Sequence, residues 1–266
     1  MKVLIIGAGN MGKTYARSFL SSRFIEAQDL FILIGKKMPV ELPVEIPKNN
    51  IQSQAGEFIS EVDIIILAVK PQDFTDLAIQ IRPFIKPEQL ILSIMAGKEI
   101  KSLKEHLNAK RVIRCMPNLP AQIGMGMTVF TASNDLDKKE LFIIQNLINT
   151  TGKSVYVENE SLIDAATAIS GSGPAYVYYF MQAMISSAVK MGFTLSQAEL
   201  LVNQTFMGAV HLHNQSEFTC EEWIEKVASK GGTTEAALEF FKTGNVNSDI
   251  EMALFSAFNR AKELGQ

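Results

Sequence analysis

The chain has 266 residues, enough for one large domain or two moderate ones with hydrophobic cores. Its 25 basic and 28 acidic residues are spread without long blocks, which argues against nucleic acid or an anionic membrane surface as a partner. Cys115 and Cys220 lack metal or disulfide spacing, and His211 and His213 point in different directions on a helix, so we expect no metal. A small-molecule partner and a reducing, cytoplasmic setting fit this composition.

The first ten residues, MKVLIIGAGN, predict a buried parallel strand at Val3–Ile6. Their apolar run is too short for a secretory signal. The most apolar later run, 175–189, carries Gln182 and two serines and falls short of the ~20 apolar residues that a membrane-spanning helix needs. We therefore expect no membrane partner.

A glycine-rich turn, GAGNMG, follows this strand directly, and a helical pattern begins inside it. In dinucleotide-binding folds the first glycine allows the tight turn, the second lets a pyrophosphate approach the backbone, and the third lets helix and strand pack closely. Strand, turn and helix in this order predict a nucleotide site. Its cofactor contacts are expected at Gly7, Gly9, Asn10, Met11 and Gly12. The alternative is a glycine-rich turn without a ligand.

Further apolar runs predict strands that alternate with helical or loop segments. They lie at 30–34, 64–69, 90–94, 111–115, 127–130 and 154–157. This alternation predicts an α/β fold with an N-terminal, Rossmann-like, doubly wound parallel sheet.

The composition changes after residue 157 to Ala, Met, Gln and aromatic residues. We therefore expect a nucleotide-binding domain at 1–158 and an all-helical second domain at 159–266. Ser161 is expected to cap the first helix of this domain, which breaks at 171–174, where Pro174 suits the first turn of the next helix. Five or so apolar helices carry more apolar surface than one small bundle buries, which predicts a homodimer or higher homo-oligomer.

The end of the second predicted strand distinguishes the two nicotinamide dinucleotides. An acidic residue there holds a ribose 2′-hydroxyl, whereas basic residues favour a 2′-phosphate. Lys36 and Lys37 stand at this place, and no acidic residue follows until Glu41. The pattern favours NADP(H) over NAD(H), with NADH as a second option. The alternative is a solvent-exposed lysine turn.

Two other predicted strands end in unusual loops. Ala68-Val69-Lys70-Pro71 follows one strand, and Cys115-Met116-Pro117-Asn118 follows another. Both loops are expected at the carboxyl edge of the sheet, where ligands bind, so Lys70 and Asn118 should face the cofactor. The alternative, that the prolines only end the strands, does not explain a lysine at this edge.

The stretch VASKGGTTEAALEFF, at 227–241, places two glycines and two threonines at the start of an apolar helix. Threonine hydroxyls are ordinary helix caps. Gly231 and Gly232 additionally let the backbone approach a ligand, and the helix end favours an anion. Glu235 adds negative charge here and is expected to point away from that anion. A capped helix after a loop is the alternative.

Six blocks of the sequence resemble one family closely, pyrroline-5-carboxylate reductase, and the resemblance runs essentially end to end. The blocks are GAGNMG at 7–12, AVKPQ at 68–72, SIMAGKEI at 93–100, MPNLPA at 116–121, LIDAATAISGSGPAYVYYF at 162–180 and VASKGGTTEAAL at 227–238. The last two are specific to the family, whereas many dehydrogenases share the first.

The resemblance implies NADPH-dependent reduction of 1-pyrroline-5-carboxylate, a cyclic imino acid, to L-proline, the last step of proline biosynthesis. It also implies a helical domain that dimerises by intertwining and completes the substrate site between subunits. The substrate carboxylate would bind at Ser229, Gly231, Gly232, Thr233 and Thr234, with the Thr234 hydroxyl as the candidate catalytic group that hydrogen bonds with the ring nitrogen. Further cofactor contacts would come from Ala68, Val69, Lys70, Pro71, Ala96, Gly97 and Asn118.

Three residues depart from the family pattern. Lys230 replaces a usual proline, Leu119 a usual threonine, and Ala55 an asparagine that often contacts the ribose. The first two keep open a regulatory relative that binds NADPH without turnover. A β-hydroxyacid dehydrogenase is a second alternative, but its catalytic lysine lies about four residues past the glycine-rich break. Here no lysine follows Gly173 until Lys190.

Overall fold

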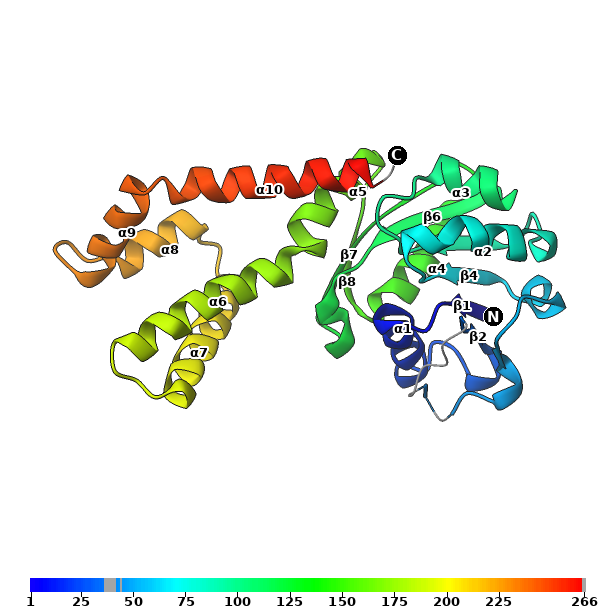
Figure 1. The fold of residues 1–266 in the computed structure, drawn as a ribbon, viewed down its shortest axis with the longest axis horizontal. Helices are drawn as coiled ribbons and strands as arrows, with labels where there is room; N and C mark the ends of the chain where they lie inside the picture. The colour runs from blue at the N-terminus through cyan, green and yellow to red at the C-terminus, as the bar shows by residue number, and fades with distance from the viewer. Residues whose placement is uncertain (36–41, 44, 265–266) are drawn as a thin grey trace. The chain divides into compact units, whose positions relative to one another are not determined.

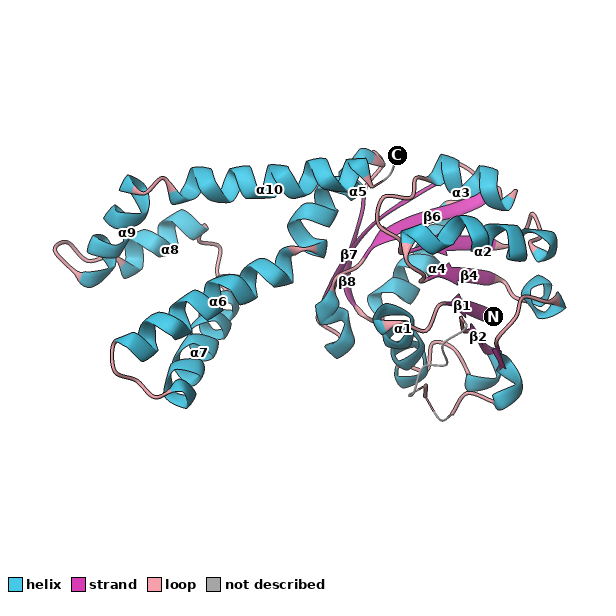
Figure 2. Ribbon diagram, viewed as in Figure 1, coloured by secondary structure: helices cyan, strands magenta, loops and turns pink. Residues whose placement is uncertain are grey.

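The computed structural model describes residues 1–35, 42–43 and 45–264 (Figure 1). The chain divides into two compact units, which are described separately. Unit 1 is Met1–Pro174 with Ala257–Gln266, and unit 2 is Ala175–Ser256. Among the described residues, all strands belong to unit 1, and unit 2 consists of helices and their connections (Figure 2). The domain boundary after residue 158, which follows the last strand, remains our proposal.

As far as its residues are described, unit 1 is built on one eight-stranded sheet with the order β3-β2-β1-β4-β5-β6-β7-β8. The strands are β1 (Val3–Ile6), β2 (Leu30–Leu33), β3 (Ile51–Gln52), β4 (Ile64–Leu67), β5 (Leu90–Ser93), β6 (Arg111–Met116), β7 (Gly126–Ala132) and β8 (Gly152–Tyr156). The predicted doubly wound, mainly parallel sheet is confirmed. One pair, β6 with β7, is antiparallel, because its short connection leaves no room for a crossover helix.

Helices cover both faces of this sheet, which explains why β1, β2 and β4 are apolar throughout. Val3 and Ile5 of β1 pack with α1 (Asn10–Ser21) and α4 (Lys138–Asn149). Leu4 and Ile6 pack on the opposite face with α2 (Phe74–Ile81) and α3 (Ile100–Leu107). Two hydrophobic cores therefore hold β1 and β4 rigidly side by side.

The chain leaves the sheet through α5 (Ser161–Ala166), a π-helical turn (Thr167–Gly171) and α6 (Gly173–Lys190). The predicted break before Pro174 is therefore confirmed as a π turn. The prediction that Ser161 caps α5 is wrong: the cap position is Glu160, and the Asn159 side chain accepts from the Ser161 amide at 3.0 Å.

Four more helices follow in the described part of the chain. They are α7 (Leu195–Asn214), α8 (Cys220–Val227), α9 (Thr233–Thr243) and α10 (Val246–Glu263). In α7 and α8 a threonine and the third helical residue form a reciprocal capping box, as between Thr219 and Glu222. The prediction of an all-helical second domain is confirmed.

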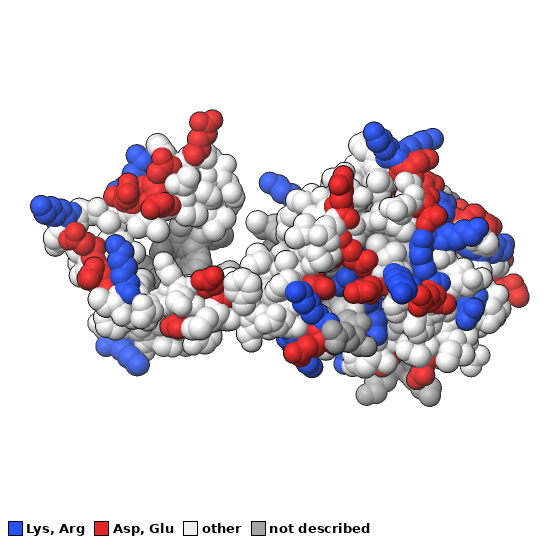
Figure 3. All heavy atoms as spheres, turned by 90° about the horizontal axis from the view of Figure 1, so that it is seen from above, with Lys and Arg blue, Asp and Glu red and all other residues white. Residues whose placement is uncertain are grey.

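Charged side chains of both signs alternate over the face of unit 1 seen in Figure 3, without a block of one sign. This agrees with the near-balanced composition. Within the described ranges, no helix has the length and apolar character needed to cross a bilayer.

Candidate dinucleotide and substrate sites

The glycine turn lies where the sheet order reverses, between β1 and β4. Gly7 has φ +101°, a conformation that glycine adopts readily, and a Cβ there would lie 2.6 Å from the Ala68 carbonyl oxygen. A Cβ on Gly12 would overlap the Gly7 carbonyl oxygen. These two glycines therefore serve the close packing of β1, β4 and α1.

Gly9, the second glycine of the motif, differs from Gly7 and Gly12. An added Cβ there would meet no described atom within 4 Å, so packing does not require this glycine. Gly9 is the cap residue of α1, and no described side chain caps this helix end. Gly9 and Asn10 are exposed. Unpaired amide groups at an open helix start suit an anion such as a pyrophosphate.

The loops after β4 and β5 reach the same carboxyl edge. The Ala68 amide donates to the Ile6 carbonyl at 2.8 Å, which places the 68–71 segment beside the glycine turn. Lys70 is exposed, as a residue facing a ligand should be. After β5, Gly97 takes a left-handed conformation with φ +73° and is preceded by half-buried Ala96. The structure thus brings three of the predicted cofactor segments to one edge.

Asn118, after β6, uses its whole side chain within the protein. Its Nδ2 donates to the carbonyl and the hydroxyl of Ser170 at 3.2 and 3.3 Å, and its Oδ1 accepts from the Met127 amide at 2.8 Å. The residue therefore braces β6 and β7 against the π turn. A contact with the cofactor remains a prediction. Lys36 and Lys37 lie outside the described residues.

Two buried groups behind the glycine turn are unsuited to proton transfer. Burial raises the pKa of the Tyr15 hydroxyl, with the Cys115 thiol adding to the effect, and burial raises the pKa of Cys115 itself. Both side chains are fully buried and stay neutral at physiological pH. In the part of the chain that the structure describes, no three His, Cys, Asp or Glu side chains form a metal-binding group.

The predicted anion site lies in unit 2, between α8 and α9. Gly231 has φ +74°, and Gly232 is the cap residue of α9. The Gly232 amide donates to the Ser229 carbonyl at 2.9 Å, which closes the loop into a turn. A Cβ on Gly232 would lie 2.5 Å from the Ser229 hydroxyl, so only glycine fits beside this side chain. No side chain in the described part of the chain caps α9.

Glu235 does not point away, and that prediction is wrong. Its Oε2 accepts from the Gly231 amide at 2.6 Å. Glu235 is the third residue of α9, the position from which a glutamate commonly reaches back to an amide at the helix start. The loop therefore already binds one carboxylate, which belongs to the protein itself.

Sequence reasoning missed a buried charge cluster in unit 1. Arg114 of β6 is 1% exposed and forms ion pairs with Glu160 and Asp164. A signal was available: an arginine inside an apolar strand, between buried Ile113 and Cys115, needs a buried partner. The sequence does not reveal which acidic residues supply it.

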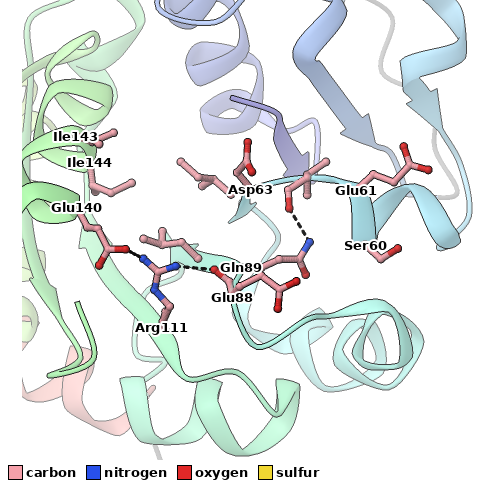
Figure 4. Close-up of a pocket in the computed structure, with 12 residues that line it drawn as sticks. Ser60, Glu61, Asp63, Glu88, Gln89, Arg111, Glu140, Ile143 and Ile144 are labelled. Carbon is pink, nitrogen blue, oxygen red and sulfur yellow. Dashed lines mark hydrogen bonds and ion pairs between the residues drawn. The ribbon is translucent and has the colours of Figure 1, made fainter. Parts of the chain in front are cut away.

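A pocket on unit 1 lies at the opposite, amino edge of the sheet (Figure 4). Asp63, Gln89 and Arg111 line it, at the starts of β4, β5 and β6. Arg111 is tied there to Glu140 and to the Glu88 carbonyl. Dinucleotides bind at the carboxyl edge, so this pocket is separate from the predicted cofactor site.

A strand, a glycine turn and a helix at the reversal point of a doubly wound sheet define a dinucleotide-binding protein of the Rossmann class. Family comparison agrees: residues 2–97 match the family described as NADP oxidoreductase, coenzyme F420-dependent, and residues 160–264 match pyrroline-5-carboxylate reductase dimerisation. The chain belongs to the pyrroline-5-carboxylate reductase family.

Individual relatives support this assignment along the whole chain. The pyrroline-5-carboxylate reductase of Pseudomonas aeruginosa is 34% identical over 266 residues, covering 100% of this chain and 97% of the relative. Pyrroline-5-carboxylate reductase 2 of Bacillus subtilis is also 34% identical, covering 99% of this chain and 95% of the relative. The crystal structure of the Plasmodium falciparum pyrroline carboxylate reductase with NADP bound has a TM-score of 0.90 at 27% identity, covering 100% and 98% of the two chains. The Coxiella burnetii enzyme has a TM-score of 0.86 at 28% identity, with the same coverage.

Proposed function

We propose that this protein reduces 1-pyrroline-5-carboxylate to L-proline with NADPH. The observation that carries the proposal is the match to a relative named pyrroline-5-carboxylate reductase over 100% of the chain. This match includes both the glycine turn of unit 1 and the Gly231–Gly232 loop of unit 2. The proposed reaction is therefore one hydride transfer from a nicotinamide to the imine carbon.

The residues of unit 1 fit the cofactor. The open space over Gly9 and the start of α1 suit the pyrophosphate, and the 68–71 and 96–97 segments form the rest of the edge. NADPH, when bound, supplies the hydride, and the protein supplies orientation. Lys36 and Lys37 would hold the 2′-phosphate, so we propose NADPH as the preferred cofactor and NADH as the weaker one.

The start of α9 would hold the substrate carboxylate. The first amides of a helix have no intrahelical partner, and here the Gly232 amide is already bonded to Ser229. The Thr233 and Thr234 amides therefore remain to bind an anion, together with the Ser229 hydroxyl and, once Glu235 is displaced, the Gly231 amide. Charge-assisted hydrogen bonds of this kind are among the stronger ones.

The Thr234 hydroxyl would hydrogen bond the ring nitrogen once the carboxylate is bound. A hydroxyl is a weak acid, but a ring imine can arrive already protonated, so positioning supplies most of what the reaction needs. The neutral, buried Tyr15 and Cys115 have no part in this step.

We also propose that the protein works as a homodimer or a larger homo-oligomer in the cytoplasm. Large apolar side chains are exposed on the helices of a single chain, among them Tyr179, 75% exposed, Phe240, 74%, and Met252, 61%. Such surface is typical of an obligate interface. Dimerisation would complete the substrate site.

NADPH oxidation at 340 nm with 1-pyrroline-5-carboxylate tests the function. Turnover is expected in the parent protein. Gly232→Val should raise the KM for the imino acid at least tenfold, because the new side chain would collide with Ser229. Thr234→Ala should lower kcat instead. NADPH binding without turnover would favour a regulatory protein, and an unchanged KM in Gly232→Val would refute the carboxylate assignment.

A further inference from the structure

We propose that Arg114, Glu160 and Asp164, here called the Arg114 cluster, form a positioning device for the cofactor site. Among the residues that the structure describes, the cluster has no hydrogen bond or ion pair with an expected cofactor contact. It acts through the segments that precede α3 and follow β6. The inference rests on the proposed function only in taking the carboxyl edge of the sheet as the NADPH site.

The cluster joins β6 to α5 inside unit 1. The Arg114 Nη2 donates to the Asp164 Oδ1 at 2.5 Å, and the Nη1 donates to the Glu160 Oε1 at 3.2 Å. Asp164 has 12% of its side chain exposed, so this contact is well shielded from water. Shielding strengthens the attraction between the charges and also makes the loss of one partner costly.

Glu160 makes a second contact that reaches the cofactor edge. The same Oε1 accepts from the Ile100 amide, the first amide of α3, at 2.7 Å. The cap residue of α3, Glu99, makes no side-chain cap of its own within the described residues. A carboxylate 60 positions further along the chain therefore caps α3.

This cap fixes one end of the 94–99 segment, which contains Ala96 and Gly97. The other end is fixed by the sheet, because the Ile94 amide donates to the Leu67 carbonyl at 3.1 Å. A short segment held at both ends keeps its shape without a ligand. Loss of the Glu160 contact would free one end while β5 stays in place.

Asp164 supports the neighbouring segment. It anchors α5, which continues into the π turn, where Ser170 accepts from Asn118. A Cβ on Gly171 would lie 2.5 Å from the Met116 Cε, so the π turn packs closely on the end of β6. π turns inside helices are common at functional sites. Arg114, through Glu160 and Asp164, thereby supports both the segment before α3 and the segment after β6.

Stability alone is a poor reason for such a cluster, because apolar residues of similar volume often stabilise a core as well as buried ions do. Directional hydrogen bonds give something that apolar packing does not, a defined position for the Ile100 amide. A second ion pair on β6 is less shielded from water than the Arg114 cluster. At the amino edge Arg111, with 23% of its side chain exposed, pairs with Glu140, with 31% exposed (Figure 4).

The test compares Glu160→Ala, Glu160→Gln and the control Glu140→Gln in the full chain. Glutamine at position 160 keeps an oxygen for the Ile100 amide and loses the charge. Glutamine at position 140 also loses an ion pair on β6 and keeps the oxygen that accepts from the Asp137 amide. The readouts are the Kd of NADPH from its fluorescence, which needs no turnover, and the KM for each substrate.

Glu160→Ala should raise the Kd and the KM of NADPH about tenfold and leave the KM for the imino acid within about twofold. Glu160→Gln should recover most of this loss, and Glu140→Gln should match the parent. If Glu160→Ala does not fold, Asp164→Asn replaces it and should raise the Kd about threefold. The proposal is overturned if the Kd of NADPH stays within twofold of the parent in folded Glu160→Ala, or in Asp164→Asn where that variant replaces it. It is also overturned if Glu140→Gln raises the Kd as much as Glu160→Ala does. Failure of the proposed function would appear separately, as a parent protein that binds NADPH without turnover.

Discussion

The variant Gly9→Ala tests whether Gly9 serves cofactor binding, whereas Gly7 and Gly12 serve the packing of the glycine turn. Gly9 has φ −71° and ψ −170°, which alanine adopts without strain, and the space around it is open. Restricting the unfolded chain should stabilise by about 0.4–1 kcal/mol, and alanine is a poorer helix cap than glycine by roughly 0.5–1 kcal/mol. The two effects offset each other, so the free energy of unfolding should change by less than about 0.5 kcal/mol.

Cofactor binding should respond very differently. The added methyl group would occupy the space over the start of α1 where a pyrophosphate approaches the backbone, and we expect NADPH affinity to fall at least about tenfold, or about 1.4 kcal/mol. NADPH titration and urea unfolding of the same preparation measure both effects. Gly12→Ala is the comparison, because its Cβ would overlap the Gly7 carbonyl and should cost about 1–3 kcal/mol of stability. Unchanged NADPH affinity in Gly9→Ala would refute the assignment of this turn to the pyrophosphate.

Three further predictions address other parts of the chain. Lys36→Ala with Lys37→Ala should raise the KM for NADPH about tenfold more than that for NADH, and equal losses would remove the 2′-phosphate assignment. Glu235→Gln should lower the KM for the imino acid about two- to threefold, because it removes a negative charge that competes at the Gly231 amide; a higher KM would contradict this. Cys115 is fully buried with a raised pKa, whereas Cys220 is exposed, so a thiol reagent should modify one cysteine in the native protein and two after denaturation. Fast reaction of both in the native state would speak against that packing.

Much of the fold could be predicted because it depends on local patterns. Apolar runs in parallel strands are covered on both faces, so β1, β4 and β5 are recognisable from composition alone. β3 was not predicted because its two residues, Ile51 and Gln52, form too short a run. The antiparallel pairing of β7 depends on the path of the connecting loop, which composition does not encode.

The candidate site shows the same division. The glycine turn could be predicted because Gly7 and Gly12 meet local steric demands and the spacing of the motif gives the position of Gly9. The contacts of Arg114, Asn118 and Glu235 could not, because each depends on which groups the fold brings within hydrogen-bond distance. The wrong prediction for Glu235 considered only its repulsion from a bound anion. In the structure its carboxylate accepts a hydrogen bond from the Gly231 amide in the same loop.

The central claim is that the start of α9 holds the substrate carboxylate and thereby orients the ring toward the nicotinamide. A crystal structure with the product L-proline bound is the most direct test. The account predicts the proline carboxylate within hydrogen-bond distance of the Thr233 and Thr234 amides and the Ser229 hydroxyl, with Glu235 displaced from Gly231. A proline carboxylate bound elsewhere, with the Glu235–Gly231 contact intact, would contradict it.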